Sequence, residues 1–222
     1  MSISNNLTQI KSQLPSHVTL VAVSKTKPVA DLMEAYDAGQ RIFGENKIQE
    51  MTEKWEQMPK DIEWHMIGHV QTNKVKYMAP YVSLIHGVDS LKLLQEINKQ
   101  AAKNNRVINC LLQVYIAEEE SKFGLDEQEL DEILKQVQID NENYKNTRIV
   151  GLMGMATFTE NQNQIEKEFQ NLKSIFDKVS QLSTENCQLN TLSMGMSGDY
   201  QLAISCGSTM VRIGSSIFGS RK

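Results

Sequence analysis

Short apolar runs alternate with longer amphipathic stretches along most of this chain. The run at residues 19–23, TLVAV, is β-branched and continuously apolar, which is typical of a strand buried on both faces. Similar runs predict eight strands in all, at residues 19–23, 41–44, 63–68, 82–88, 109–117, 148–155, 191–196 and 210–214.

The segments between these runs carry apolar residues at helical spacing. The clearest helical repeats lie at residues 92–103, 125–138 and 164–182. Pro28 suits the first turn of a further helix, which should end at Gly39. An apolar stripe before the first strand predicts an extra N-terminal helix that ends before Pro15.

Alternating strands and helices imply parallel strands with helical crossovers, and eight such units close into a barrel. The competing architecture is an open, doubly wound sheet. No G-x-G-x-x-G motif follows the first strand, and the polar residues of chemical interest follow many different strands. We therefore predict an α/β fold with one domain, a (β/α)8 TIM barrel over residues 1–222.

Composition narrows the class of protein. The chain has 222 residues, of which 40% are hydrophobic and 23% charged, and no apolar run is long enough to cross a bilayer. Its N-terminus lacks the pattern of a signal peptide, so we expect a cytoplasmic protein. With 23 basic and 27 acidic residues, the net charge of −4 gives no general attraction to nucleic acid or membrane.

Cysteine and histidine give no pattern of a metal or disulfide site. Cys110, Cys187 and Cys206 are far apart and odd in number, and we interpret them as small buried hydrophobes. His65 and His69 would share a face of an extended strand, but no carboxylate accompanies them at a known ligand spacing. We therefore expect no metal.

Two lysines, Lys25 and Lys27, follow the first strand. A lysine at the rim of a buried strand is most simply a surface residue that caps the strand. The alternative is chemical, because an amine that has lost part of its proton affinity through desolvation attacks aldehydes and forms a Schiff base. The spacing alone does not choose between the two lysines.

The last two strands end in loops suited to an anion. Residues 195–199 (GMSGD) and 214–216 (GSS) combine glycine, which permits close backbone approach, with a serine hydroxyl. Each loop taken singly also suits an ordinary turn. In barrels of this kind, however, the loops after strands seven and eight often hold a phosphate group.

Arg212 lies in the last apolar strand, where a guanidinium needs a partner because it keeps its charge. One interpretation is a salt bridge at the bottom of the barrel. The other is a contact with the ring nitrogen of a cofactor, where a permanent cation would keep a pyridine unprotonated.

Seven motifs in fixed order resemble the pyridoxal phosphate homeostasis proteins (YggS-like), which are themselves similar to the barrel domain of alanine racemase. They are VAVSKTKP, RIFGENKIQE, EWHMIGHVQTNK, SKFGL, GLMGMATF, LSMGMSGDYQLAI and GSTMVRIGSSIFG. The resemblance covers nearly the whole chain and implies a barrel of the alanine racemase N-terminal type.

The resemblance also implies roles for six residues. Lys25, rather than Lys27, would form the Schiff base with pyridoxal 5′-phosphate. Ser197, Gly214 and Ser215 would hold its phosphate, Arg212 would face the pyridine nitrogen, and Asn46 would line the pocket. Some members have threonine at the position of Ser215, and serine retains the hydroxyl.

Membership of this family implies a cofactor-handling protein rather than an enzyme. A racemase needs two opposed bases, and the resemblance places the second on an additional C-terminal domain of a partner subunit, which we do not expect after residue 222. We expect a monomer that holds the cofactor, with apo-enzymes as recipients and Lys122 as a transient second amine. A weak amino acid racemase, a Schiff-base aldolase acting on a phosphorylated sugar and an interaction module are the alternatives.

Overall fold

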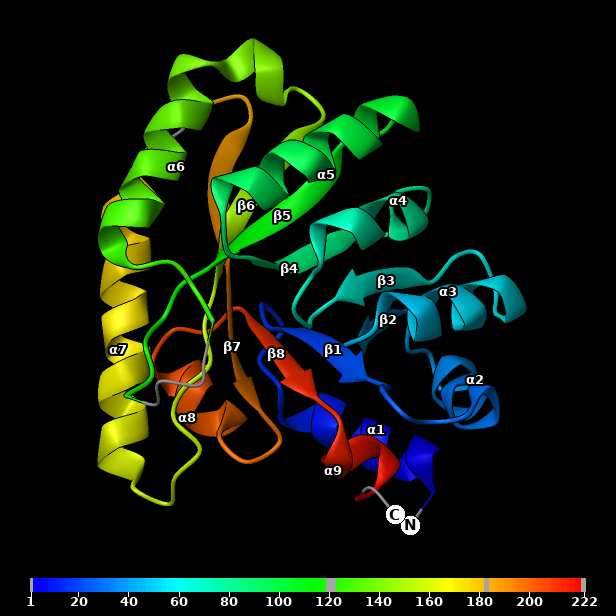
Figure 1. The fold of residues 1–222 in the computed structure, drawn as a ribbon. Coiled ribbons are helices and arrows are strands. Elements are labelled where there is room, and N and C mark those ends of the chain that lie inside the picture. Colours follow the sequence, from blue (N-terminus) through cyan, green and yellow to red (C-terminus); the bar gives the residue numbers. More distant parts are fainter. Residues whose placement is uncertain (1, 119–122, 182–183, 221–222) are drawn as a thin grey trace.

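The computed structural model of the chain describes residues 2–118, 123–181 and 184–220. Eight parallel strands form a closed barrel in the order β1 to β8, with β8 paired back to β1 (Figure 1). This confirms the predicted (β/α)8 barrel, and the open sheet is wrong. The strands are β1 (Thr19–Val23), β2 (Ile42–Glu45), β3 (Glu63–Met66), β4 (Leu84–Val88), β5 (Ile108–Gln113), β6 (Thr147–Met153), β7 (Cys187–Met196) and β8 (Met210–Ile213).

Helices surround the barrel (Figure 1). They are α1 (Ile3–Gln13), α2 (Val29–Asp37), α3 (Ile48–Gln57), α4 (Val75–Met78), α5 (Leu91–Lys103), α6 (Glu127–Ile139), α7 (Gln162–Val179), α8 (Tyr200–Ser205) and α9 (Ser215–Phe218), with short 3-10 turns η1 (Thr72–Lys74) and η2 (Asn141–Tyr144). The extra helix α1 ends before Pro15 as predicted, and it lies beside α9, where Asn6 Nδ2 donates to Ile217 O at 3.0 Å. Helices from the first and last parts of the described chain are therefore in contact.

Some boundaries differ from the predicted ones. Helix α6 begins at Glu127 rather than at residue 125, because the side chain of Asp126 caps the helix and Glu129 returns a bond to the Asp126 backbone. Leu125 instead forms a β-bridge with Val114. Strand β7 begins earlier than predicted, at Cys187, where its register with β6 is shifted.

Side chains alternate between the two faces of the barrel wall. One apolar cluster of Val21, Leu84, Leu111, Met153 and Met210 lies inside the barrel, whereas a larger cluster packs the strands against the helices. Along β1 and β8, the alternation that points Val21 and Met210 inward also points Arg212 inward. Positions further along these strands lie at the carboxyl-terminal mouth of the barrel.

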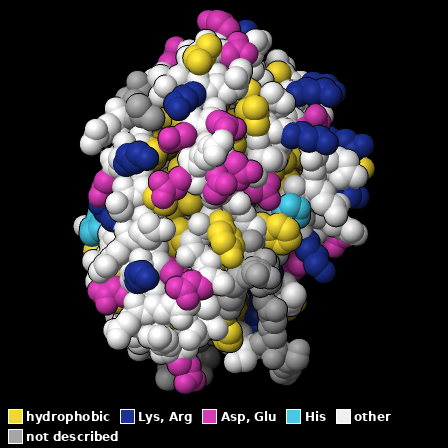
Figure 2. Space-filling model, turned by 60° about the vertical axis from the view of Figure 1, so that its left-hand side comes forward, with side chains coloured by type: hydrophobic (Ala, Val, Ile, Leu, Met, Phe, Trp, Pro, Cys, Tyr) yellow, Lys and Arg dark blue, Asp and Glu magenta, His cyan; other side chains and the backbone are white. Residues whose placement is uncertain are grey.

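The surface charges, the helices and the cysteines can be compared with what the composition predicted. Figure 2 shows a face of the molecule on which acidic, basic and apolar side chains are intermixed. None of the helices in the described ranges is long and apolar enough to span a membrane. Cys110 and Cys187 are fully buried as predicted, but Cys206 is half-buried and so only partly fits that interpretation.

Candidate functional site

The six residues singled out from the sequence follow or end four neighbouring strands, β7, β8, β1 and β2. Strand β1 pairs with β8 through Val21 and Arg212, and with β2 through Val23 and Gly44. All six residues therefore belong to one side of the barrel mouth, since parallel strands end at the same rim. This juxtaposition gathers an amine, hydroxyls, an amide and a guanidinium from both ends of the chain.

The two lysines after β1 have different surroundings. Lys27 Nζ donates to Phe218 O at 2.9 Å and to Ser220 O at 3.3 Å, so it fastens the segment around the end of α9. Lys25 is half-buried. It lies in the turn that follows β1, two residues beyond the end of the strand.

The loops after β7 and β8 are joined by a hydrogen bond. The backbone N–H of Gly214 donates to Ser197 Oγ at 3.2 Å. Gly214 also permits close approach of β8 to β1, because a Cβ there would lie 3.0 Å from Val23 O. Ser215, the first residue of α9, is exposed. The hydroxyl of Ser197 and the backbone N–H of Gly214 thus lie together beside β1.

Arg212 is 4% exposed and points into the barrel. One guanidinium nitrogen donates to Ser193 O at 2.9 Å and to Ser193 Oγ at 2.6 Å, and the other donates to Gly154 O at 3.1 Å. Burial lowers its pKa to about 10, partly offset by Asp199, so the group is still a cation at neutral pH. Within the described ranges Arg212 forms no ion pair, so the interpretation as a salt bridge at the barrel bottom is wrong.

A hydrogen-bonded chain runs from Arg212 through the barrel interior. Ser193 Oγ lies 3.1 Å from His86 Nδ1, and His86 Nε2 lies 3.1 Å from His65 Nδ1. Burial lowers the pKa of His65 to about 3, and it also lowers the pKa of His86, to which His65 and Arg212 contribute. Both imidazoles are therefore neutral, so that in each ring one nitrogen can donate a hydrogen bond and the other can accept one.

His65 and His69 do not form a pair. Strand β3 ends at Met66, so the chain has turned before His69, whose half-exposed ring instead contacts Asp89 with Nδ1 at 3.2 Å from Oδ2. The expected common face is wrong for this reason. In the described part of the chain, no group of three or more His, Cys, Asp or Glu residues has the arrangement of a metal site.

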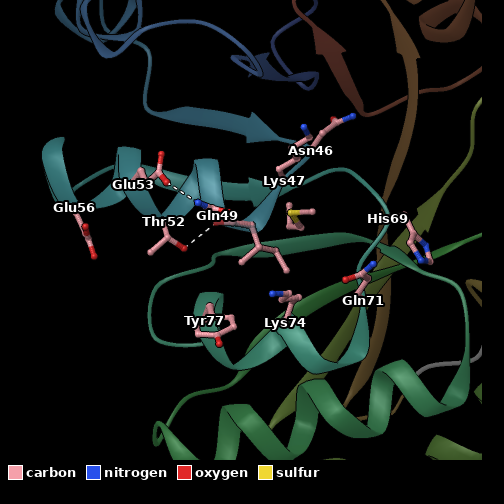
Figure 3. Close-up of a pocket in the computed structure, with 12 residues that line it drawn as sticks. Asn46, Lys47, Gln49, Thr52, Glu53, Glu56, His69, Gln71, Lys74 and Tyr77 are labelled. Carbon is pink, nitrogen blue, oxygen red and sulfur yellow. Dashed lines mark hydrogen bonds between the residues drawn. The ribbon is translucent and has the colours of Figure 1, made fainter.

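Asn46 lies between the mouth and a neighbouring groove. This groove, of about 600 Å³, is formed by α3 together with the segment that leads into α4, and its lining is drawn in Figure 3. Lys47 and Lys74 supply positive charge, and Glu53 and Glu56 supply negative charge along α3. Of the six predicted residues only Asn46 lines it. The groove is therefore adjacent to the predicted cofactor site rather than identical with it.

A buried ion cluster behind Lys25 was not predicted. Lys54 Nζ lies 2.7 Å from Glu45 Oε1 and 2.7 Å from Glu50 Oε1. Burial raises the pKa of Glu45, although Lys54 and a hydrogen bond from Ser24 oppose the shift. The sequence signals available were a glutamate at the end of an apolar strand, IFGE, and an i,i+4 pair of glutamate and lysine.

Two sequence-based interpretations concern residues around 118–122. Lys122 lies outside the described residues, as do Glu119 and Glu120. Glu118 is described, and its backbone N–H donates to Thr157 Oγ1 at 3.0 Å. From its sequence, the acidic run at residues 118–120 (EEE) is interpreted as a solvated loop, and this stays a prediction.

The closed barrel defines a (β/α)8 protein of the alanine racemase N-terminal type. The family model "Alanine racemase, N-terminal domain" matches residues 1–222, and a pyridoxal phosphate homeostasis protein of Pasteurella multocida is 39% identical over 100% of this chain and 98% of its own. The chain therefore belongs to the alanine racemase N-terminal domain family and, within it, to the pyridoxal phosphate homeostasis proteins.

Solved structures agree with this assignment. PipY of Synechococcus elongatus without PLP is 34% identical, with a TM-score of 0.91 over 98% of this chain and 100% of its own. The same protein with PLP bound gives 33% identity and a TM-score of 0.87 over the same shares. Alanine racemase of E. faecalis is 16% identical with a TM-score of 0.76, and this chain covers 58% of it, so that likeness concerns the fold alone.

Proposed function

We propose that this chain binds pyridoxal 5′-phosphate and holds it as a Schiff base on Lys25. The observation that carries the proposal is the hydrogen bond between Ser197 and Gly214. It joins the loops after β7 and β8, both suited to an anion, next to β1, the strand that Lys25 follows. The related PipY has been solved with PLP bound, and the relatives are named pyridoxal phosphate homeostasis proteins. The cofactor supplies the aldehyde, and the chain supplies the amine.

The residues of the mouth fit the other parts of the cofactor. Ser197, Gly214 and Ser215 would bind the phosphate through hydroxyl and backbone N–H groups. The terminal nitrogens of Arg212 donate to Ser193 and Gly154, which fixes the guanidinium inside the barrel. Arg212 would face the pyridine nitrogen, and Asn46 would line the pocket.

The first prediction tests Lys25 directly. Purified protein incubated with PLP should gain visible absorbance, and borohydride should attach the cofactor to the peptide that contains Lys25. Lys25→Arg keeps the charge but removes the reactive amine. It should abolish the adduct and weaken PLP binding at least about tenfold, equivalent to about 1.4 kcal/mol.

Lys27→Arg is the matched control. Arginine retains the charge and the donors that Lys27 directs at Phe218 O and Ser220 O. This variant should form the adduct normally. An adduct on Lys27, or a Lys25→Arg protein with unchanged spectrum and affinity, would refute the assignment.

We further propose that the cofactor is held without catalytic turnover. The name homeostasis protein, shared by the curated relatives, supports a role in handling PLP rather than in converting a substrate. With stoichiometric loaded protein, the circular dichroism of L-alanine should stay constant over long incubation. Loss of the signal over many turnovers would instead identify a racemase, and cleavage of a phosphorylated sugar would identify an aldolase.

We also propose that residues 1–222 act as one cytoplasmic, monomeric PLP-binding domain that passes the cofactor to apo-enzymes. The closed barrel uses strands from both ends of the sequence, which supports a single unit. Light scattering should give the mass of one chain. Loaded protein should reactivate a PLP-dependent apo-enzyme, and Lys122→Ala should slow that transfer if Lys122 acts as a second amine.

A further inference from the structure

Two side chains of helix α3 form hydrogen bonds with the backbone on both sides of Lys25. Before it, Ser24 O accepts a hydrogen bond from Lys54 Nζ at 2.8 Å. After it, Thr26 N–H donates to Glu50 Oε1 at 2.6 Å. The two peptide groups that flank the lysine are thus tied to two side chains one turn apart on the same helix.

The same side chains form a buried ion cluster with the end of β2. Lys54 Nζ lies 2.7 Å from carboxylate oxygens of both Glu45 and Glu50, and Ser24 Oγ donates to Glu45 Oε1 at 2.6 Å. The side chains of Lys54 and Glu45 are 5% and 0% exposed. Glu45 Oε2 is buried without a hydrogen bond in the described structure. Because burying ions is expensive and an apolar cluster of equal volume is commonly as stable, stability alone does not account for this arrangement.

The backbone that is held in this way is strained. Thr26 has a φ of 65°, in the left-handed region that β-branched residues rarely adopt. Its N–H donates to Glu50 Oε1, so the cluster acts directly on the strained residue. Without that acceptor, the turn would relax toward the conformations that threonine prefers.

We infer that Glu50 and Lys54, supported by Glu45, are positioning residues that fix the turn carrying Lys25 so that its amine faces the barrel mouth. The inference rests on the proposed function of Lys25. If the turn is already ordered in the folded protein, binding does not have to pay the entropy cost of ordering it. Such preorganisation raises the affinity for a ligand. Residues that never touch the cofactor would in this way govern how tightly it is held.

Glu50→Ala is the most direct test. Its side chain is partly exposed, and alanine is a good helix former, so the variant should fold. Amide hydrogen exchange at Thr26 should accelerate at least about tenfold, because a bond to a charged acceptor is lost. PLP binding should weaken about tenfold, with little change in the melting temperature. Lys54→Met is less suitable, since it would leave the carboxylate of Glu45 buried without its cation.

Two further variants separate positioning from general effects. Glu50→Gln keeps an oxygen that can accept from Thr26 and should restore exchange and affinity to within about threefold of wild type. Glu56→Ala removes an exposed glutamate from the same helix, one whose carboxylate bonds to none of the described residues. It should behave as wild type in both measurements.

The inference is wrong if Thr26 exchange and PLP affinity in Glu50→Ala match those of Glu56→Ala. It is equally wrong if affinity falls only in step with the melting temperature while Thr26 exchange is unchanged, because that would be a structural role. Failure of the proposed function looks different: wild-type protein would form no borohydride-stable bond at Lys25. The exchange measurement needs no cofactor and would still decide whether α3 holds the turn.

Discussion

At the scale of single residues, the rim of the barrel between β2 and β4 depends on Gly68. A Cβ at Gly68 would lie 2.5 Å from Asn46 O and 2.8 Å from Asn46 Cα, and these are backbone atoms that no rotamer change can move. A Cβ at Gly87 would in turn lie 2.8 Å from Gly68 O. The loops after β2 and β3 are thus packed backbone to backbone, which fixes where Asn46 lies.

We predict that Gly68→Ala destabilises the protein. Overpacking against backbone should lower the free energy of unfolding by about 1–3 kcal/mol, and the displaced Asn46 should weaken PLP binding. Urea denaturation and PLP titration measure the two effects. Gly198→Ala is the control, because a Cβ there meets nothing within 4 Å, and its unfolding free energy should change by less than about 0.5 kcal/mol.

Residues with their own chemical signature could be found from the sequence. Lys25 follows a buried strand and Arg212 lies inside one, so the apolar pattern around each of them marks its charge as unusual. The partners of Arg212 could not be found in this way. Ser193 and Gly154 meet it only because β6, β7 and β8 bring distant segments together with shifted registers.

At the scale of elements, the short helix α9 is held from two sides. Asn6 of α1 donates to Ile217 O, and Lys27 after β1 donates to Phe218 O. Because α9 has only one turn, these contacts, together with burial of Ile217 and Phe218, determine its place beside the loop of Ser197.

Asn6→Ala should loosen this attachment. The loss of one hydrogen bond to a backbone carbonyl should lower the unfolding free energy by about 1 kcal/mol, and PLP should bind less tightly because Ser215 begins α9. Urea denaturation measures the first effect. Asn5→Ala changes an exposed residue of the same helix and should leave both quantities near their wild-type values, whereas equal effects of the two substitutions would contradict the argument.

The order of the elements could be predicted more securely than their ends. The sequence predicts all eight strands, because a continuous apolar run indicates a buried strand whatever its packing partners are. The start of α6 was misplaced although Asp126 and Glu129 have the spacing of a capping box, since Leu125 also suits the helical pattern. The early part of β7 was missed because polar Gln188 and Asn190 alternate there with buried residues.

At the scale of the whole molecule, the barrel interior contains both an apolar cluster and a polar network. Val21 and Leu84 belong to the apolar cluster, and a hydrogen-bonded chain runs from Arg212 through Ser193 and His86 to His65. Which inward residues come together could not be read from the sequence, because that depends on the stagger of all the strands.

The buried histidines predict a loss of stability in acid. Their pKa values are lowered in the folded protein, to about 3 for His65, so below the ordinary value of 6.5 the unfolded chain binds protons that the folded chain does not. The stability that they contribute is therefore complete above pH 6.5 and falls as the pH falls. Protonation of His65 in the unfolded chain should lower the free energy of unfolding by about 2 kcal/mol between pH 7 and pH 5. His86 should act in the same direction.

His65→Gln should reduce the change in the free energy of unfolding between pH 7 and pH 5 by up to about 2 kcal/mol. Glutamine cannot gain a proton, yet it can still hydrogen-bond to His86. Urea denaturation at pH 7 and pH 5 measures the difference, with exposed His17→Gln as the control that should keep the wild-type dependence. Identical acid sensitivity of wild type and His65→Gln would exclude His65 as a source.

Closure of the barrel between β1 and β8 has a consequence for the newborn polypeptide. Lys25 is synthesised well before Ser197, Arg212 and Ser215, because about 170 residues separate them in the sequence. The proposed cofactor site can therefore form only after β8 has been synthesised and has paired with β1.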